Sequence, residues 1–127
     1  AGKKPIGSRE AMQRTVETSP LYASWPHKVA ADIQIIRKAI EENNFEALGA
    51  AAESNALTMH ATMMGATPAV VYWLPESVET MHRVWKLRRE GLPLYFTMDA
   101  GPNVKLLFLD KDRQHVEEHF PDLLVAQ

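Results

Sequence analysis

The feature that most constrains the fold is a change in the spacing of apolar residues near Leu94. Before this point apolar residues recur every three or four positions, which is the period of an amphipathic helix. After it, Leu94, Phe96 and Met98 occupy alternate positions, as in a strand with one buried face. A chain that is helical over two-thirds of its length and then forms adjacent strands is expected to be an α+β domain.

Three main helices are predicted before this change. They run from about His27 to Glu42, from Phe45 to near Gly65, and from Pro75 to near Gly91. The segment 69–73, which lies between two prolines, is expected to be extended or irregular. The stripes expected to face the core are Val29, Ile33, Ile36 and Ile40; Phe45, Leu48, Ala52, Ala56, Met59 and Met63; and Val78, Met81, Trp85 and Arg88.

Two strands are predicted on either side of the polar turn Asp99–Asn103. The first carries the alternation that begins at Leu94, and Val104–Leu109 is predicted to be a buried strand. Asp112–Phe120 is predicted to form a short helix, and Lys3–Gly7 to form another strand. With 127 residues and no internal repeat, residues 1–127 are expected to form a single domain.

Composition excludes several classes of protein. The chain has no cysteine, so disulfides, zinc ribbons and thiol nucleophiles are excluded. No apolar run approaches the roughly 20 residues of a membrane span, and no signal peptide opens the chain, so a cytoplasmic protein without a membrane partner is expected. The net charge of −2 argues against a nucleic-acid partner.

The basic first segment supports two interpretations. Ser8 is a good N-cap residue, and a helix after it would present free backbone N–H groups and a positive dipole end to an anion. Arg9 adds a fork suited to phosphate. The alternative is a capped surface helix at a solvated basic end of the chain, and the residues by themselves leave both interpretations open. The charged residues of this segment are Lys3, Lys4, Arg9, Glu10 and Arg14.

The turn at Asp99 also supports two interpretations. A carboxylate at a strand end can project into a cleft, where it is suited to orienting or deprotonating a hydroxyl group. Gly101 permits the backbone to approach a ligand closely. Alternatively, Asp99 begins an ordinary turn by bonding its own backbone.

For several other residues a structural role is the favoured hypothesis. His115 and His119 have the spacing of two ligands on a helix, but the pattern shows no third ligand to complete a site, so no metal site is predicted. His60 is expected to be a packed or hydrogen-bonded histidine, and Glu53 and Asn55 are left without an assigned role. Met59, Met63 and Met64 are expected in the core, and Trp25, Trp73 and Trp85 in the core or an interface.

The two segments together resemble the C-terminal half of the diphosphomevalonate decarboxylase family, within the GHMP kinase superfamily. The most specific match is the string Thr97–Val104, which contains the Asp99 turn. The other matching residues are Ser8, Arg9 and Met12; Thr18–Pro20, Tyr22 and Trp25; Glu53–Leu57 and Met59–Thr62; and Tyr72, Trp73 and Arg88. Two mild departures are Gly7, where the family usually has serine, and Ala11, where glycine is common.

The resemblance implies a fold and a reaction. The fold would be a GHMP kinase C-terminal-type domain, an antiparallel sheet with helices packed on one face. The reaction would be ATP-dependent decarboxylation of mevalonate diphosphate to isopentenyl diphosphate, in the mevalonate route to isoprenoids. ATP and magnesium are implied as cofactors, bound mainly by an N-terminal half that this chain lacks. A homodimer is implied, and the chain by itself is expected to be inactive.

The resemblance also implies site residues. Asp99 would be the catalytic aspartate, directed at the C3 hydroxyl of the substrate. Ser8 and Arg9 would bind the diphosphate, and Met12 and Ala100 would line the same pocket. Two alternatives remain open: a mevalonate-type kinase of the same superfamily that does not decarboxylate, and a non-catalytic dimerisation or ligand-binding module.

Overall fold

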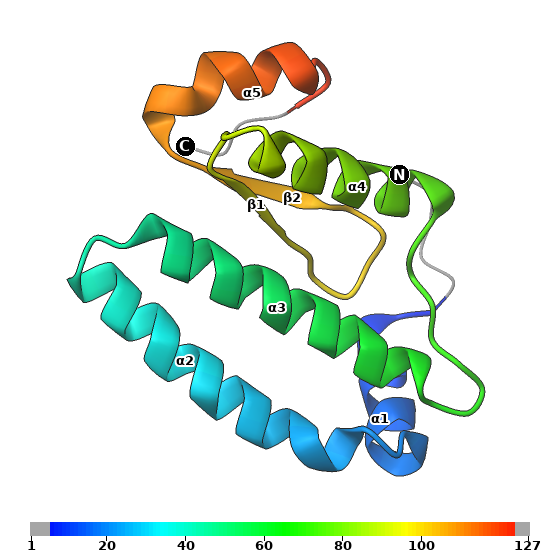
Figure 1. Ribbon diagram of the computed structural model, residues 1–127. Coiled ribbons are helices and arrows are strands. Elements are labelled where there is room, and N and C mark those ends of the chain that lie inside the picture. Colours follow the sequence, from blue (N-terminus) through cyan, green and yellow to red (C-terminus); the bar gives the residue numbers. More distant parts are fainter. Residues whose placement is uncertain (1–5, 124–127) are drawn as a thin grey trace.

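A computed structural model describes residues 6–123 of the chain, and its elements follow the predicted order (Figure 1). The predicted strand Lys3–Gly7 falls largely outside the described residues. The elements are α1 (Ser8–Thr18), a 3-10 turn (Tyr22–Ser24), α2 (Trp25–Glu41), α3 (Phe45–Met64), α4 (Pro75–Arg89), β1 (Leu94–Thr97), β2 (Lys105–Phe108), a second 3-10 turn (Asp110–Asp112) and α5 (Arg113–His119).

The two strands form an antiparallel hairpin, in which Leu94 pairs with Phe108 and Thr97 with Lys105. Helices α4 and α5 lie on one side of this hairpin, and α3 lies between it and α2 (Figure 1). The predicted α+β arrangement, an antiparallel sheet with helices packed against it, is therefore confirmed. No described helix is long and apolar enough to cross a membrane.

The main core lies between the hairpin and its helices. Leu94 and Phe96 are fully buried and Met98 is nearly so, which confirms the predicted alternation. They pack with residues of α3, α4 and α5 because each of these helices turns an apolar face toward β1. The buried residues of this cluster are Ala56, Met81, Val84, Leu87, Leu92, Leu94, Phe96, Met98, Val116 and Phe120.

Helix α3 approaches β1 unusually closely. A Cβ atom added at Gly49 would lie 2.4 Å from Cδ2 of Tyr95, so no other residue fits there without a shift. Small residues, Ala51 and Ala56, are buried elsewhere on the same helix. The close approach places α3 where its longer polar side chains reach the backbone of β1.

The predicted core stripe of α2 is only partly buried. Ile33 and Ile40 remain 46% and 61% exposed, whereas Asp32 and Ala39 are the buried residues of this helix. The physical reason is that α2 packs against α3 alone over most of its length, so the contact is too narrow to cover the whole stripe. The cost of burying the Asp32 carboxylate is compensated, because it accepts hydrogen bonds from Lys28 Nζ at 3.1 Å and Asn55 Nδ2 at 3.0 Å.

The prediction of a buried second strand is wrong. Lys105 is exposed, and the next three residues of β2 are only half-buried. A hollow of about 1080 Å³ runs along this strand, so its side chains are only partly covered. Its apolar lining includes Phe45, Val104, Leu106, Phe108 and Leu123.

Candidate active site at the β1–β2 turn

The Asp99 side chain is presented to solvent at the start of the turn. It follows the buried strand β1 by two positions, and its side chain is 63% exposed. Lys105, the first residue of β2, lies beside it, with 3.0 Å between Nζ and Asp99 Oδ2. A substrate can reach an exposed carboxylate on a fixed turn without any rearrangement of the core.

The backbone of the turn is held from two helices. The Asp99 carbonyl accepts from the Gly101 amide at 2.9 Å and lies 2.8 Å from Nε2 of His60, a buried residue of α3. At the other end, the buried Ser77 hydroxyl of α4 donates to the Pro102 carbonyl at 2.6 Å. His60 is therefore packed and hydrogen-bonded, as the sequence analysis favoured.

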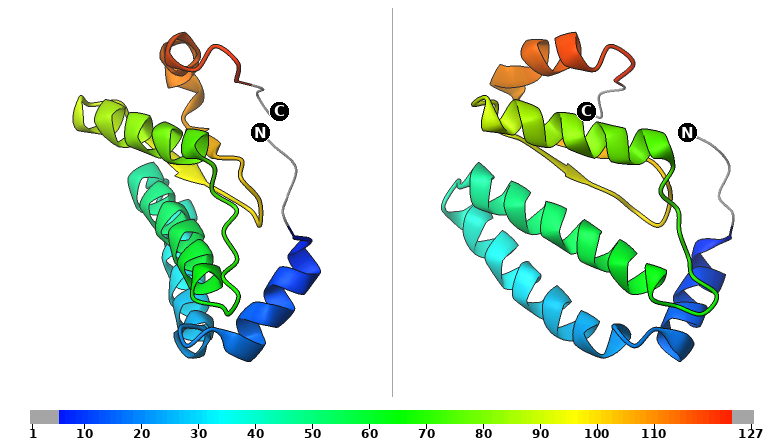
Figure 2. Two further views of the ribbon diagram at one scale, coloured as in Figure 1. Left: turned by 90° about the vertical axis from the view of Figure 1, so that its right-hand side faces the viewer. Right: turned by 45° about the vertical axis from the view of Figure 1, so that its right-hand side comes forward.

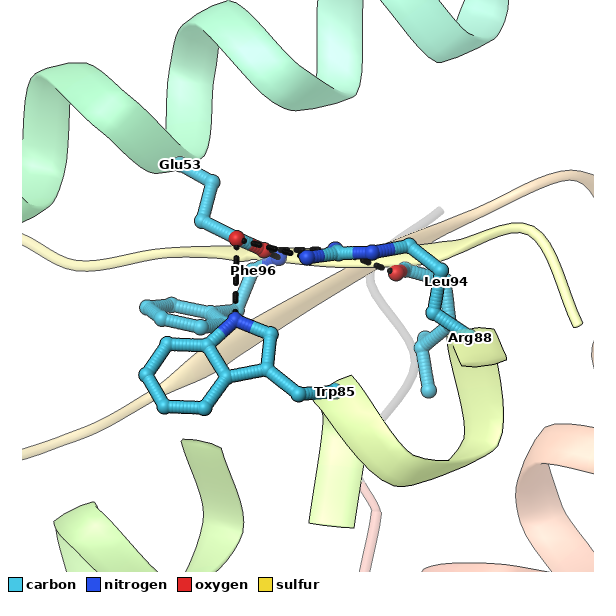
Figure 3. Close-up of polar contacts among 5 residues, drawn as sticks. All are labelled: Glu53, Trp85, Arg88, Leu94 and Phe96. Carbon is cyan, nitrogen blue, oxygen red and sulfur yellow. Dashed lines mark hydrogen bonds and ion pairs between the residues drawn. The ribbon is translucent and has the colours of Figure 1, made fainter. Parts of the chain in front are cut away.

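The outer edge of β1 is closed by an ion pair (Figure 3). Both carboxylate oxygens of Glu53 accept from Arg88, at 2.9 and 3.0 Å. Glu53 also accepts from the Phe96 amide at 3.2 Å, and Arg88 donates to the Leu94 carbonyl at 2.9 Å. Leu94 and Phe96 are two positions apart, so these groups lie on the same edge of β1, the one turned away from β2.

Two further contacts complete this network, and Figure 3 shows the first of them. Trp85 Nε1 donates to Glu53 Oε2 at 3.1 Å, and the Arg88 guanidinium lies 4.4 Å from the centre of the Tyr95 ring. Its hydrogen bonds to Glu53 raise the pKa of Arg88. The network ties α3 and α4 to β1, the strand that precedes Asp99, which gives Glu53 the role that the sequence left open.

The start of α1 differs from its prediction in one respect. Gly7, and not Ser8, is the N-cap residue, and no side chain caps the helix. Ser8 and Arg9 are its first helical residues, and both are exposed, as is Met12 at 41%. The first hydrogen bond within the helix joins the Ala11 amide to the Gly7 carbonyl at 2.9 Å, so the amides of residues 8–10 precede it.

A second hydrophobic cluster joins the Asp99 turn to α1. Ala100 packs against this cluster, which also contains Ala11 from the first turns of α1. Tyr72 is a buried member of this cluster and donates through its hydroxyl to the Ile6 carbonyl at 2.7 Å. Figure 2 shows the β1–β2 turn and the start of α1 on the same side of the molecule. The remaining members are Met63, Ala66 and Val70, with Ile6 and Met59 beside them.

Burial raises the pKa of the Tyr72 hydroxyl, so it remains a hydrogen-bond donor at neutral pH. Met63 is buried in the same cluster, which confirms the prediction that it is a core residue. The rings of His115 and His119 lie 5.1 Å apart on α5. Among residues 6–123 no group of three or more His, Cys, Asp or Glu residues is placed to hold a metal ion.

Two residues that hold this site, Lys105 and Ser77, were not predicted from the sequence, and neither was the contact between His60 and the Asp99 carbonyl. One signal for Lys105 was available, because a hairpin closed by a five-residue turn brings the ends of its strands together. The contacts of Ser77 and His60 join residues 25 and 39 positions apart, and no local pattern encodes such a distance.

The hairpin, its helices and the exposed carboxylate define an α+β domain of the GHMP kinase C-terminal type. A family model described as "Mevalonate 5-diphosphate decarboxylase C-terminal domain" matches residues 1–126. The chain belongs to this family.

Solved structures of similar sequence agree with this assignment. A mevalonate pyrophosphate decarboxylase from Streptococcus pyogenes is 44% identical, with a TM-score of 0.91 over 98% of this chain and 40% of that one. A structure described as MDDEF in complex with MVAPP, AMPPCP and magnesium is 41% identical, with a TM-score of 0.90 over 98% of this chain and 38% of that one.

Among curated proteins, the phosphomevalonate decarboxylase of Haloferax volcanii is 33% identical over 95 residues, which are 74% of this chain and 29% of that protein. The chain thus spans less than half the length of each of these relatives.

Proposed function

We propose that this chain is the substrate-side half of an ATP-dependent diphosphomevalonate decarboxylase of the mevalonate route to isoprenoids. The reaction phosphorylates the tertiary hydroxyl of mevalonate diphosphate and then releases phosphate and carbon dioxide, giving isopentenyl diphosphate. The observation that carries the proposal is the Asp99 carboxylate, held at the end of β1 on a turn that shares a hydrophobic cluster with the start of α1.

In this proposal Asp99 accepts or orients the proton of the C3 hydroxyl. A carboxylate is suited to this task when it is within hydrogen-bond reach of the proton. Phosphoryl transfer depends mainly on alignment and charge neutralisation, so a carboxylate fixed through its backbone serves the first of these needs. Lys105, 3.0 Å from Asp99, adds a positive charge at the same place.

The start of α1 is proposed to bind the diphosphate. The amides of residues 8–10 precede the first helical hydrogen bond, and a helix N-terminus attracts anions. Ser8 and Arg9 lie there and are exposed, and Arg9 can contact phosphate through two N–H groups. Met12 and Ala100 are proposed to contact the same substrate.

ATP and magnesium are proposed as cofactors because a 41% identical relative is described in complex with AMPPCP and magnesium. The described part of this chain has no ligand set for a metal ion, and the sequence has no glycine-rich phosphate loop. We therefore propose that an N-terminal half outside this chain binds the nucleotide. A homodimer in the cytoplasm is also proposed, and light scattering of the longer protein would test the dimer.

The experiment that tests the proposal uses the protein with its upstream half, ATP, magnesium and mevalonate diphosphate labelled at the carboxyl carbon. Carbon dioxide and ADP are counted for the parent, for Asp99→Asn and for the control Asp110→Asn. Asp110 is also an exposed carboxylate, paired with Arg113 at 3.2 Å. We expect equal amounts of both products, with kcat reduced by roughly 10²- to 10⁴-fold in Asp99→Asn alone.

Each other outcome identifies a different protein. ADP without carbon dioxide indicates a mevalonate-type kinase. Neither product, from a folded parent, indicates a non-catalytic dimerisation or ligand-binding module. Because the Haloferax relative is named for phosphomevalonate, the monophosphate is run in parallel. Faster turnover of the monophosphate would contradict the diphosphate assignment.

A further inference from the structure

The Asp99 turn is anchored through its backbone by side chains that are themselves buried. His60 is 1% exposed and Ser77 is 4% exposed. They come from different helices, α3 and α4, and they bind the carbonyls of Asp99 and Pro102 at opposite ends of the turn. Burying two polar side chains is unfavourable unless both are hydrogen-bonded, and here each of them makes one bond to the turn.

The chemistry of the His60 contact fixes which ring nitrogen carries hydrogen. A carbonyl oxygen only accepts hydrogen bonds, so Nε2 of His60 must carry hydrogen and donate it to Asp99 O over 2.8 Å. Burial lowers the pKa of His60, although the hydrogen bond to the Asp99 backbone and the nearby carboxylate oppose this shift. The ring is therefore neutral at neutral pH, with its hydrogen on Nε2.

The ring itself has little freedom to move. It meets the ring of Tyr72 edge-on, with 6.2 Å between centroids, and lies 5.8 Å from the ring of Trp73. The Asp99 carbonyl accepts a second bond from Gly101, at 2.9 Å. Two donors on one carbonyl fix the peptide plane that follows Asp99, and this plane sets the direction of an otherwise exposed carboxylate.

We infer that His60 is a positioning residue, which holds the Asp99 carboxylate in line with the substrate hydroxyl through the hydrogen bond from its Nε2–H to the Asp99 carbonyl. The inference rests on the proposed function of Asp99. It assigns His60 no contact with substrate and no proton transfer. Its effect is on alignment, and a displacement of about 1 Å at a reacting group lowers the rate by up to roughly 100-fold.

The test compares His60→Met, which keeps an apolar side chain of similar length without a donor, with His60→Gln, whose amide can donate from nearly the same place. Both are made in the protein with its upstream half. We expect kcat to fall roughly 10- to 100-fold in His60→Met, with KM for mevalonate diphosphate within about threefold, because substrate binding is assigned to Ser8 and Arg9. His60→Gln should recover most of kcat.

Ser19→Ala is the matched control. Ser19 is buried, and its hydroxyl donates to the Thr62 carbonyl at 2.6 Å, so its removal costs a bond of the same kind without touching the turn. We expect Ser19→Ala to lower the melting temperature and to leave kcat unchanged. An unchanged kcat in His60→Met, or an equal loss in His60→Gln, would overturn the inference.

A spectroscopic measurement on the 127-residue chain decides the structural part independently of activity. Long-range ¹H–¹⁵N spectra should show His60 as the neutral tautomer with hydrogen on Nε2. Hydrogen exchange of the Gly101 amide with solvent should be faster in His60→Met than in the parent or in Ser19→Ala. A charged ring, or the opposite tautomer, would overturn the inference. A folded parent without decarboxylation would refute the proposed function first, and the positioning role with it.

Discussion

Asp99 shows how a single residue can be both exposed and fixed. Its carboxylate is 63% exposed and paired with an exposed lysine, an arrangement that contributes about 0–1 kcal/mol to stability. Its carbonyl, by contrast, accepts from His60 and Gly101. The side chain is thus exposed to solvent while the backbone determines where it points.

The burial of His60 predicts a pH dependence of stability. The unfolded residue takes up a proton as the pH falls through about 6.5, whereas the pKa in the folded protein lies lower. In the interval between the two pKa values the unfolded state binds more protons, so the free energy of unfolding decreases as the pH is lowered. Above about 6.5 both states are neutral, and His60 adds no pH dependence.

His60→Gln tests this effect because it keeps a donor and removes the titration. The groups facing the ring are Asp99, Tyr72 and Trp73, all retained in the variant. Urea unfolding of both proteins at pH 7.5 and 5.5 should show a smaller loss of stability on acidification in His60→Gln. Equal losses in the two proteins would show that the buried ring does not resist protonation.

The sequence predicted the position of Asp99 but not all of its contacts. Asp99, Ala100 and the turn could be located because a polar, glycine-containing stretch between two apolar runs has a local signature. The hydrogen bonds to His60 and Ser77 had none, since both partners are distant along the chain and the donors are ordinary buried residues. The N-cap was misplaced by one residue because serine is the stronger capping residue, yet Gly7 has the extended backbone that the cap requires.

At the scale of elements, Glu53 and Arg88 join α3, α4 and β1. The outer edge of β1 would otherwise expose the Phe96 amide and the Leu94 carbonyl to an apolar environment. The ion pair satisfies both groups, as a neighbouring strand would do. It therefore replaces a third strand at this edge of the sheet.

Removing one partner of this pair should be strongly destabilising. Glu53 is 7% exposed, so Glu53→Gln leaves the Arg88 guanidinium facing an amide in a largely buried site. We expect the free energy of unfolding to fall by about 2–4 kcal/mol, whereas Asp110→Asn, at an exposed pair, should cost less than about 1 kcal/mol. Urea unfolding measures both.

A double-mutant cycle with Arg88→Met separates the pair from its surroundings. If the pair acts as a unit, the double variant should lose less free energy of unfolding than the two single variants lose when their losses are added. Additive losses would show that Glu53 and Arg88 stabilise the protein separately, and the account of the closed edge would then be wrong.

The elements themselves were largely predictable, and their environments were less so. Period and capping residues located α2, α3, α4 and the two strands because these signals are local. The burial of α2 and β2 was overestimated, since an apolar stripe gives the face that can be covered but not the element that covers it. The predicted and observed burial differ at two places: the exposed Ile33 and Ile40 of α2, and the hollow along β2.

At the scale of the whole molecule, the proposed site is open to water. Asp99, Ser8, Arg9 and Met12 are all exposed. Phosphoryl transfer and the breakdown of a charged intermediate are favoured in a preorganised site from which water is excluded. The proposed reaction therefore needs a cover that residues 6–123 do not supply, which agrees with a chain spanning 40% of its Streptococcus pyogenes relative.

The last prediction follows from this openness: the 127-residue chain by itself should not decarboxylate mevalonate diphosphate. With labelled substrate, ATP and magnesium, its rate should equal the background of a heat-inactivated sample, while circular dichroism shows the helices to be folded. Adding the separately produced upstream half should restore release of carbon dioxide, and the same addition to Asp99→Asn should not. Turnover by a preparation shown to contain only this chain would mean that it binds nucleotide and excludes water unaided, which would contradict the assignment of both tasks to another half.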